Sequence, residues 1–216
     1  MEIPSIETRY ADHRFRSRLE ARWAVFFDTL GIPWQYEPQG FELIPLPAGL
    51  LKKMKDEWLR EPEEDDRGHL GNYLPDFYLP KQEAWFEVKG VTPKGREWER
   101  LCRFMLLTEQ RVFIAAGSIP DTRTFEETGH PYDENNFDIL TYGDHHYAWT
   151  RCRWCGFYDI TFDARSARTR CGCHHKHYAE APCCNGDKCY RGNEPEIIAA
   201  YAAARSARFE HGQSGA

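Results

Sequence analysis

Large apolar side chains recur at helical spacing between His13 and Leu30. They fall on one face of an α-helix, and they are Phe15, Leu19, Trp23, Phe26, Phe27 and Leu30. Gly31, with Pro33 two residues further on, supplies a C-terminal stop signal. The pattern therefore predicts an amphipathic helix over 13–30 whose buried face is largely aromatic.

Three strand-like segments come after this helix. The first covers 34–43, and the other two, 72–79 and 84–89, are separated by a short Pro-Lys-Gln turn. The residues between the first two segments lack a strand pattern and contain an acidic run. We expect them to form an insertion of about 44–71 with one short helix at 51–59.

A second amphipathic pattern follows Gly95, with apolar residues spaced for a helix through Leu106. Residues 111–117 are rich in β-branched and aromatic side chains, which predicts another strand. The order helix, three strands, helix, strand predicts an α/β fold with a mixed sheet flanked by helices. A final helix is expected after Pro195.

Cysteine usage divides the 216-residue chain. Seven of its 8 cysteines fall between Cys152 and Cys189, and such a cluster in a reducing compartment more often binds metal than forms disulfides. The simplest division is an α/β domain over 1–145, a small Cys/His-rich module over 146–192, and a C-terminal helix with a polar tail over 193–216.

The formal net charge is −6, which argues against a uniformly basic nucleic-acid binder. The charge is uneven, because residues 141–216 hold 10 Lys and Arg against 8 Asp and Glu. An acidic sum still allows a nucleic-acid enzyme, since a metal site needs carboxylates and a local patch can meet the substrate. No apolar run approaches the roughly 18 residues needed to span a bilayer, and residues 1–10 carry no apolar signal segment. We expect no membrane association and a cytoplasmic location.

Two carboxylates and a lysine are predicted to meet on neighbouring strands. The two-residue period of a strand places Glu87 and Lys89 on the same face of 84–89. If that strand pairs with 72–79 as a hairpin, Asp76 lies beside Glu87, with Lys89 next to both. Two carboxylates can hold Mg²⁺ or Mn²⁺, the metal can activate a water, and a lysine can orient or deprotonate that water. The cluster predicts hydrolysis of a phosphodiester.

The first helix offers a further acid. At 100° per residue, Glu20 lies at the edge of the buried face that contains Trp23 and Phe27. A carboxylate there needs a partner or a metal. Glu37 and Glu42 on the first strand are further potential ligands, although solvent exposure is the simpler expectation for both, as it is for Glu97 and Arg103 on the second helix.

Pro75-Asp76, ten intervening residues and Glu87-Val88-Lys89 resemble the signature of the PD-(D/E)XK nuclease superfamily. The predicted element order is similar to the core of that superfamily, and Glu20 matches its first-helix acid. The resemblance implies a restriction-endonuclease-like fold in which Asp76, Glu87 and the Val88 carbonyl bind Mg²⁺ and Lys89 acts on the water. Residues 17–90 also resemble uncharacterised phage and actinobacterial proteins, which implies a bacterial or phage-infected cytoplasm. The alternative is a surface hairpin with an ordinary Glu/Lys pair and no catalytic role.

The cysteine-rich segment contains a spacing close to that of a zinc ribbon. The spacing predicts one tetrahedral zinc bound by Cys152, Cys155, Cys171 and Cys173. Other potential ligands remain, namely His177, Cys183, Cys184 and Cys189. Either some of them bind a second zinc, or a single site draws its ligands from across the module and leaves out Cys171 or Cys173.

A basic stretch lies within the same segment. No acid occurs between Ala164 and Tyr178, and phosphate contact is a reasonable role for Arg165, Arg168, Arg170 and Lys176. A solvated loop is the alternative.

These features together predict a metal-dependent nuclease, with DNA favoured over RNA, whose zinc module binds the substrate or a protein partner. The alternative is a nuclease-fold binding protein that is inactive or needs a partner, acting in phage–host interaction or as a recombination subunit.

Overall fold

The computed structural model describes residues 6–43, 71–123, 137–141, 143–165, 168–173 and 191–209, without the side chains of 143–145. The expected insertion at 44–71, with its helix at 51–59, lies outside these residues except for Gly71. So do Lys176 and all four potential ligands of a second zinc: His177, Cys183, Cys184 and Cys189.

Seven strands form a mixed sheet in the order β11-β10-β9-β8-β7-β6-β3. Their bounds are β3 Gln35–Tyr36, β6 Phe77–Leu79, β7 Ala84–Lys89, β8 Arg111–Gly117, β9 Phe137–Thr141, β10 Gly143–Arg151 and β11 Tyr158–Phe162. The β7–β8 pair is parallel, and the other neighbours are antiparallel. The expectation of an α/β fold with a mixed sheet is confirmed.

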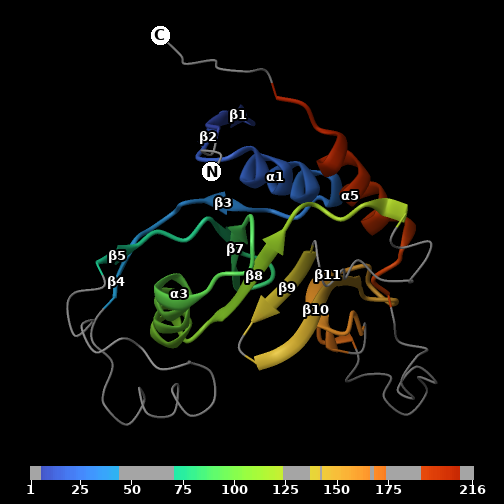
Figure 1. Cartoon of the computed structure of the whole chain (residues 1–216). Helices are drawn as coiled ribbons and strands as arrows, with labels where there is room; N and C mark the ends of the chain where they lie inside the picture. The colour runs from blue at the N-terminus through green and yellow to red at the C-terminus, as the bar shows by residue number, and fades with distance from the viewer. Residues whose placement is uncertain are drawn as a thin grey trace.

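Helices cover both faces of the sheet (Figure 1). α1 (Arg18–Leu30) and α5 (Pro195–Ser206) pack together on one face. α3 (Gly95–Thr108) lies on the other face and connects β7 to β8. Parallel neighbours need such a crossover. None of the helices in the described part of the chain is long and apolar enough to span a bilayer.

The first helix begins later than its apolar pattern predicted. Ser17 is the N-cap, with its hydroxyl accepting a hydrogen bond from the Glu20 N–H at 3.2 Å. His13 and Phe15 instead belong to β2 (His13–Phe15), which forms a small hairpin with β1 (Thr8–Tyr10). Periodicity alone missed this boundary, because Phe15 still packs into the core from the hairpin.

Two of the expected strands are each divided. Residues 34–43 give β3 in the large sheet and β4 (Phe41–Glu42) in a separate two-stranded sheet. Residues 72–79 give β5 (Asn72–Tyr73), which pairs with β4, and β6. Glu37 has a left-handed backbone conformation with φ +45°, and Pro75 lacks an N–H for a ladder. Both residues interrupt otherwise extended segments.

Strands β10 and β11 extend the main sheet past the boundary expected at residue 145. That boundary falls inside β10, and α5 returns from the far end of the chain to pack on α1. The first part of the expected zinc module is therefore continuous with the α/β core, and the C-terminal helix completes one of its layers.

An aromatic cluster fills the layer between α1, α5 and the sheet. The Trp23 ring contacts the rings of Phe26, Phe86 and Tyr201, with centroids 4.8 to 6.1 Å apart, and its side chain is fully buried. Removing a large buried aromatic costs both its burial and the cavity left behind.

We therefore expect Trp23→Ala to lower the free energy of unfolding by about 3 to 5 kcal/mol, as measured by urea denaturation. Val91→Ala is the control, because Val91 is 74% exposed and should change stability by less than about 0.5 kcal/mol. Equal stability of the two variants would contradict this account of the core.

Candidate active site and metal centre

The hairpin of β6 and β7 brings the expected carboxylates together. Phe77 pairs with Phe86 and Tyr78 with Trp85, so Asp76 comes next to Glu87. The Asp76 N–H donates to a Glu87 carboxylate oxygen at 3.2 Å, and the Val88 N–H donates to Asp76 Oδ2 at 2.7 Å. Asp76 and Glu87 are each only 2% exposed. Two acids thus lie side by side in a buried position.

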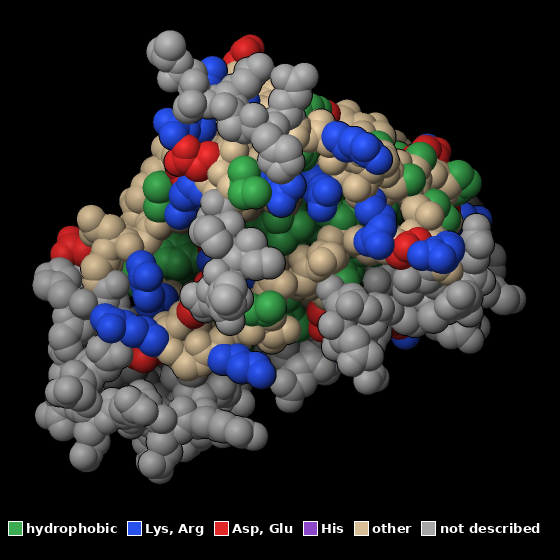
Figure 2. Space-filling model, turned by 45° about the horizontal axis from the view of Figure 1, so that its top comes forward, with side chains coloured by type: hydrophobic (Ala, Val, Ile, Leu, Met, Phe, Trp, Pro, Cys, Tyr) green, Lys and Arg blue, Asp and Glu red, His purple; other side chains and the backbone are tan. Residues whose placement is uncertain are grey.

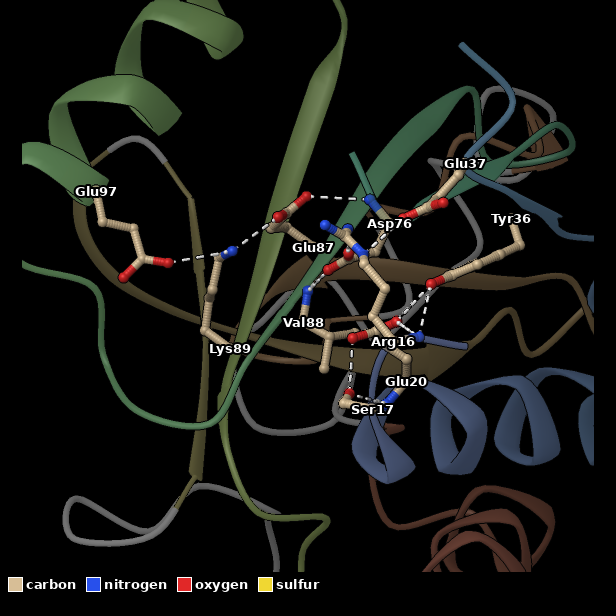
Figure 3. A network of polar contacts seen from close by, with 10 residues as sticks. All are labelled: Arg16, Ser17, Glu20, Tyr36, Glu37, Asp76, Glu87, Val88, Lys89 and Glu97. Carbon is tan, nitrogen blue, oxygen red and sulfur yellow. Dashed lines mark hydrogen bonds and ion pairs between the residues drawn. The ribbon is translucent and has the colours of Figure 1, made fainter. Parts of the chain in front are cut away.

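Lys89 lies between two carboxylates. Its Nζ is 3.0 Å from Glu87 Oε1 and 3.2 Å from Glu97 Oε1 of α3 (Figure 3). Burial lowers the pKa of Lys89, but the charges of Glu87 and Asp76 outweigh it, and the net shift is upward. The side chain is therefore a protonated donor at neutral pH, suited to orienting or stabilising an anion rather than to removing a proton.

Glu20 reaches the same network from the first turn of α1. One of its oxygens accepts from the Tyr36 hydroxyl at 2.6 Å, and the other accepts from the Ser17 hydroxyl at 2.6 Å. Its backbone N–H is capped by Ser17, so the pair forms a variant of the capping box. Glu20 is 7% exposed, which agrees with its expected place at the edge of the buried face.

Arg16 was not predicted from the sequence as part of this cluster. Its guanidinium is 2.8 Å from Asp76 Oδ1 and 2.6 Å from Glu37 Oε1. It supplies a positive charge to a cluster of acids, and its side chain is 53% exposed while that of Asp76 is 3% exposed. Arg16 and Asp76 are 60 residues apart, and no local pattern links them. The Ser17-x-x-Glu20 spacing was the one local signal, since it marks a helix start.

The other charged residues considered with this cluster, three acids and one arginine, lie in different settings. Glu37 joins it through Arg16, and Glu97 joins it through Lys89. Glu42 is exposed on β4. Arg103 is buried in an ion pair with Glu99 of the same helix, so it is a structural part of α3.

The acids of this cluster repel one another. Burial raises the pKa of Asp76 well above its usual range, and the charges of Glu87 and Glu20 raise it further. Because the folded state keeps Asp76 protonated to a higher pH than the unfolded state does, the loss of stability grows as pH rises from the usual aspartate pKa to the raised one, and it is constant above that. Arg16 and Lys89 already place positive charge beside these acids, and a bound cation would reduce the remaining cost further.

The donor set fits Mg²⁺ in chemical type. Carboxylate oxygens are the ligands that Mg²⁺ prefers, and Asp76 and Glu87 supply them side by side, whereas Glu20 does not bring a third ligand atom within 4.8 Å of both. All four oxygens of Asp76 and Glu87 accept a hydrogen bond or ion pair from the protein, and an ionised carboxylate oxygen can accept a second partner. Arg16 is the most exposed of these donors and the one that an incoming cation could replace.

Four cysteines form a second potential metal centre. Within the described residues, only Cys152, Cys155, Cys171 and Cys173 bring three or more potential ligand atoms all within 4.8 Å of one another. A tetrahedron with metal–sulfur bonds of about 2.3 Å has edges of about 3.8 Å. The four thiols are free, and they could hold a metal such as zinc.

The sheet builds both halves of this cysteine cluster. Cys152 follows β10, and its carbonyl accepts from the Gly156 N–H at 2.9 Å in a tight knuckle, where Gly156 has φ +73°. The second half is fixed by Asp159 of β11, which is fully buried, accepts from the Arg170 N–H at 2.9 Å and pairs with Arg111 of β8 at 2.8 Å. Side-chain hydrogen bonds with Cys155 and Cys171 raise the pKa of Cys173 to about 12.

The expected phosphate-binding arginines are partly neutralised. Arg165 pairs with Asp163 at 2.9 Å, and Arg170 lies 3.5 Å from Glu83. Arg168 and Arg165 both lie against the Phe162 ring, at 5.2 and 5.9 Å from its centroid. Arg168 is exposed, and it is the best placed of the three for an external anion.

Comparison with known proteins assigns no relative. No family model matches the chain, and neither a curated protein nor a solved structure matches it.

The cysteine geometry makes a testable prediction about metal content. Purified protein should contain at least one equivalent of zinc, and Cys155→Ser should contain about one equivalent less, because three thiols hold zinc far more weakly than four. Elemental analysis by mass spectrometry measures this. Cys102→Ala is the control, since Cys102 is buried in α3 and should leave the zinc content unchanged. Unchanged zinc in Cys155→Ser would contradict the site.

Proposed function

We propose that this protein is a metal-dependent nuclease with a PD-(D/E)XK-like core. The observation that carries the proposal is the buried pair of Asp76 and Glu87, with the Lys89 ammonium 3.0 Å from Glu87. The order α1, β3, β6, β7, α3, β8, with the lysine at the end of β7, supports the same reading.

Asp76 and Glu87 would hold Mg²⁺, with Glu20 and the Val88 carbonyl as further ligands. Bound there, the metal would lower the pKa of a water and neutralise charge on the scissile phosphate. The Lys89 ammonium would orient that water or face the developing charge on the phosphate. Arg16, released from Asp76, would lie next to the site as a free cation for a phosphate oxygen.

The surface charge supports a polyanionic substrate despite the acidic total. Lys and Arg side chains are spread over the described part of the face seen in Figure 2, with acidic side chains between them. On α1 and α5, Arg18, Arg22 and Arg205 lie close enough that their mutual repulsion, together with burial, lowers the pKa of Arg22. Such local clusters are what a phosphate backbone contacts.

The cysteine centre, loaded with zinc, would fix the end of the β10–β11 hairpin and present Arg168 to the substrate or to a protein partner. DNA is the favoured substrate.

Cleavage assays test the active site directly. We expect the wild type with Mg²⁺ or Mn²⁺ to cut at least one member of a panel of single-stranded, duplex and branched DNA and RNA. Asp76→Asn, Glu87→Gln and Lys89→Met should each reduce the rate by about 10²- to 10⁴-fold. Glu7→Gln, which removes an exposed carboxylate paired with Arg14, is the control and should cut normally. Full activity of Lys89→Met would refute the proposed chemistry.

Metal binding can also be measured without turnover. Because the acids repel one another, Mg²⁺ at roughly ten times its Kd should raise the melting temperature of the wild type by about 3 to 6 °C. Asp76→Asn should lose most of this increase, and Glu7→Gln should keep it. The measurement is a thermal melt in buffer without chelator, so that the cysteine centre stays loaded. An equal increase in all three proteins would place the Mg²⁺ elsewhere.

A second function, nucleic-acid or protein binding without turnover, is favoured by one specific contact. The Arg16 guanidinium, 2.8 Å from Asp76, already supplies the positive charge that a metal would bring. In that case the wild type would bind its partner without cutting, and Asp76→Asn would bind equally well.

A further inference from the structure

A cavity of about 380 Å³ opens on the face of the β6–β7 hairpin that also carries Asp76 and Glu87, although neither acid lines it. It lies between the C-terminal end of α3, the β6–β7 hairpin and the segment that joins β3 to β4. Three aromatic and three amide side chains line most of it: Phe41, Tyr78, Trp85, Gln35, Gln39 and Gln110. None of its lining residues is charged.

The aromatic wall is a connected unit. The Trp85 ring has its centroid 4.8 Å from that of Tyr78 and 5.2 Å from that of Phe41. Trp85 is 4% exposed and packs in the buried cluster between α3 and the sheet, whereas Phe41 and Tyr78 are half-buried. The wall therefore offers aromatic surface mainly from Phe41 and Tyr78, and both rings are supported by the buried Trp85.

The rest of the lining supplies hydrogen bonds without charge. Gln35, Gln39 and Gln110 are exposed residues whose amides each carry a donor and an acceptor. Flat apolar rings with neutral donors and acceptors around them suit a planar, uncharged ligand that has polar edges. A nucleobase has these properties, and the cavity is within the usual size range of small-ligand sites.

The register of β6 and β7 sets the distance from this cavity to the acids. Tyr78 pairs with Trp85. Two residues further along the hairpin, on the same face, Asp76 lies opposite Glu87. Two residues along a strand span about 6.6 Å. A base in the cavity would thus leave its own backbone close to the carboxylates and Lys89.

From these observations we propose that the cavity binds one unstacked nucleobase of a single-stranded nucleic acid, next to the phosphodiester that is cut. This inference rests on the proposed function and adds the class of substrate to it. A base inside a duplex is stacked on both faces and paired along one edge. It cannot enter the cavity without being flipped out of the duplex. Single strands, or single-stranded parts of branched molecules, are the expected substrates.

Fluorescence anisotropy tests the base site separately from cleavage. The probes are a labelled 12-nucleotide single strand and a strand of the same length in which every base is missing, both in buffer without added divalent metal. The wild type should bind the strand with bases about 10-fold more tightly. Tyr78→Ala should lose that difference, and so should the double variant Gln39→Ala/Gln110→Ala, whose side chains are exposed and contribute little to folding.

Phe209→Ala is the matched control, because Phe209 is a half-buried ring that packs on Tyr10 outside the cavity. It should bind both strands like the wild type. Equal binding of the two strands by the wild type would overturn the base site, even if the protein cuts nucleic acid. Base-dependent binding that both cavity variants remove would support the site, even if no substrate is cut, and the proposed nuclease activity would then be the part that fails.

Discussion

The register of the β6–β7 hairpin is the constraint on which the rest of the candidate site depends. A shift of one residue in a strand moves every side chain to the other face of the sheet. In the observed register, Phe77 and Phe86 enter the aromatic core under α1, while Tyr78 and Trp85 face α3. The same register places Asp76 beside Glu87. The energy of burying the two phenylalanines therefore fixes the position of the two acids.

Burying acids without a metal requires other positive charges, and the fold supplies them from separate elements. Arg16 comes from the segment before α1, and Lys89 comes from the end of β7. The backbone N–H groups of Asp76 and Val88 add two further donors. The network extends from Glu97 on α3 to Glu20 on α1 (Figure 3), so it links the helices on the two faces of the sheet. Charge compensation and layer packing are thus parts of one arrangement.

Sequence patterns predicted those features that depend on neighbours in the chain. The period of two placed Glu87 with Lys89, and the helical period placed Glu20 at the edge of a buried face; both placements agree with the structure. The spacing of the four cysteines likewise predicted their cluster. Glu87 and Lys89 share one strand, Glu20 shares one helix with the buried face, and each cysteine pair shares one turn. Local geometry therefore determines these relations, while the β10–β11 hairpin brings the two cysteine pairs together.

Such patterns did not predict the contacts between residues far apart in the sequence. Arg16 and Tyr36 come to the acids from distant segments, and the sheet gains β9, β10 and β11 by pairings that no local period encodes. The division at residue 145 rested on cysteine composition, which does not report strand pairing. The breaks at Glu37 and Pro75 were visible as residues, but their effect on which sheet each half joins depends on the tertiary structure.

The pairing of α1 with α5 has a consequence for how the chain acquires its structure during synthesis. Tyr201 of α5 covers Trp23 and Phe26 of α1, so this aromatic surface of α1 stays uncovered until α5 has been synthesised. Contacts between such distant segments close slowly and leave apolar surface open to aggregation in the meantime. Because the cysteine knuckles lie between these two helices in the chain, metal can be taken up before the last layer docks. The segment between the two helices would then fold first, and α1 and α5 would meet last.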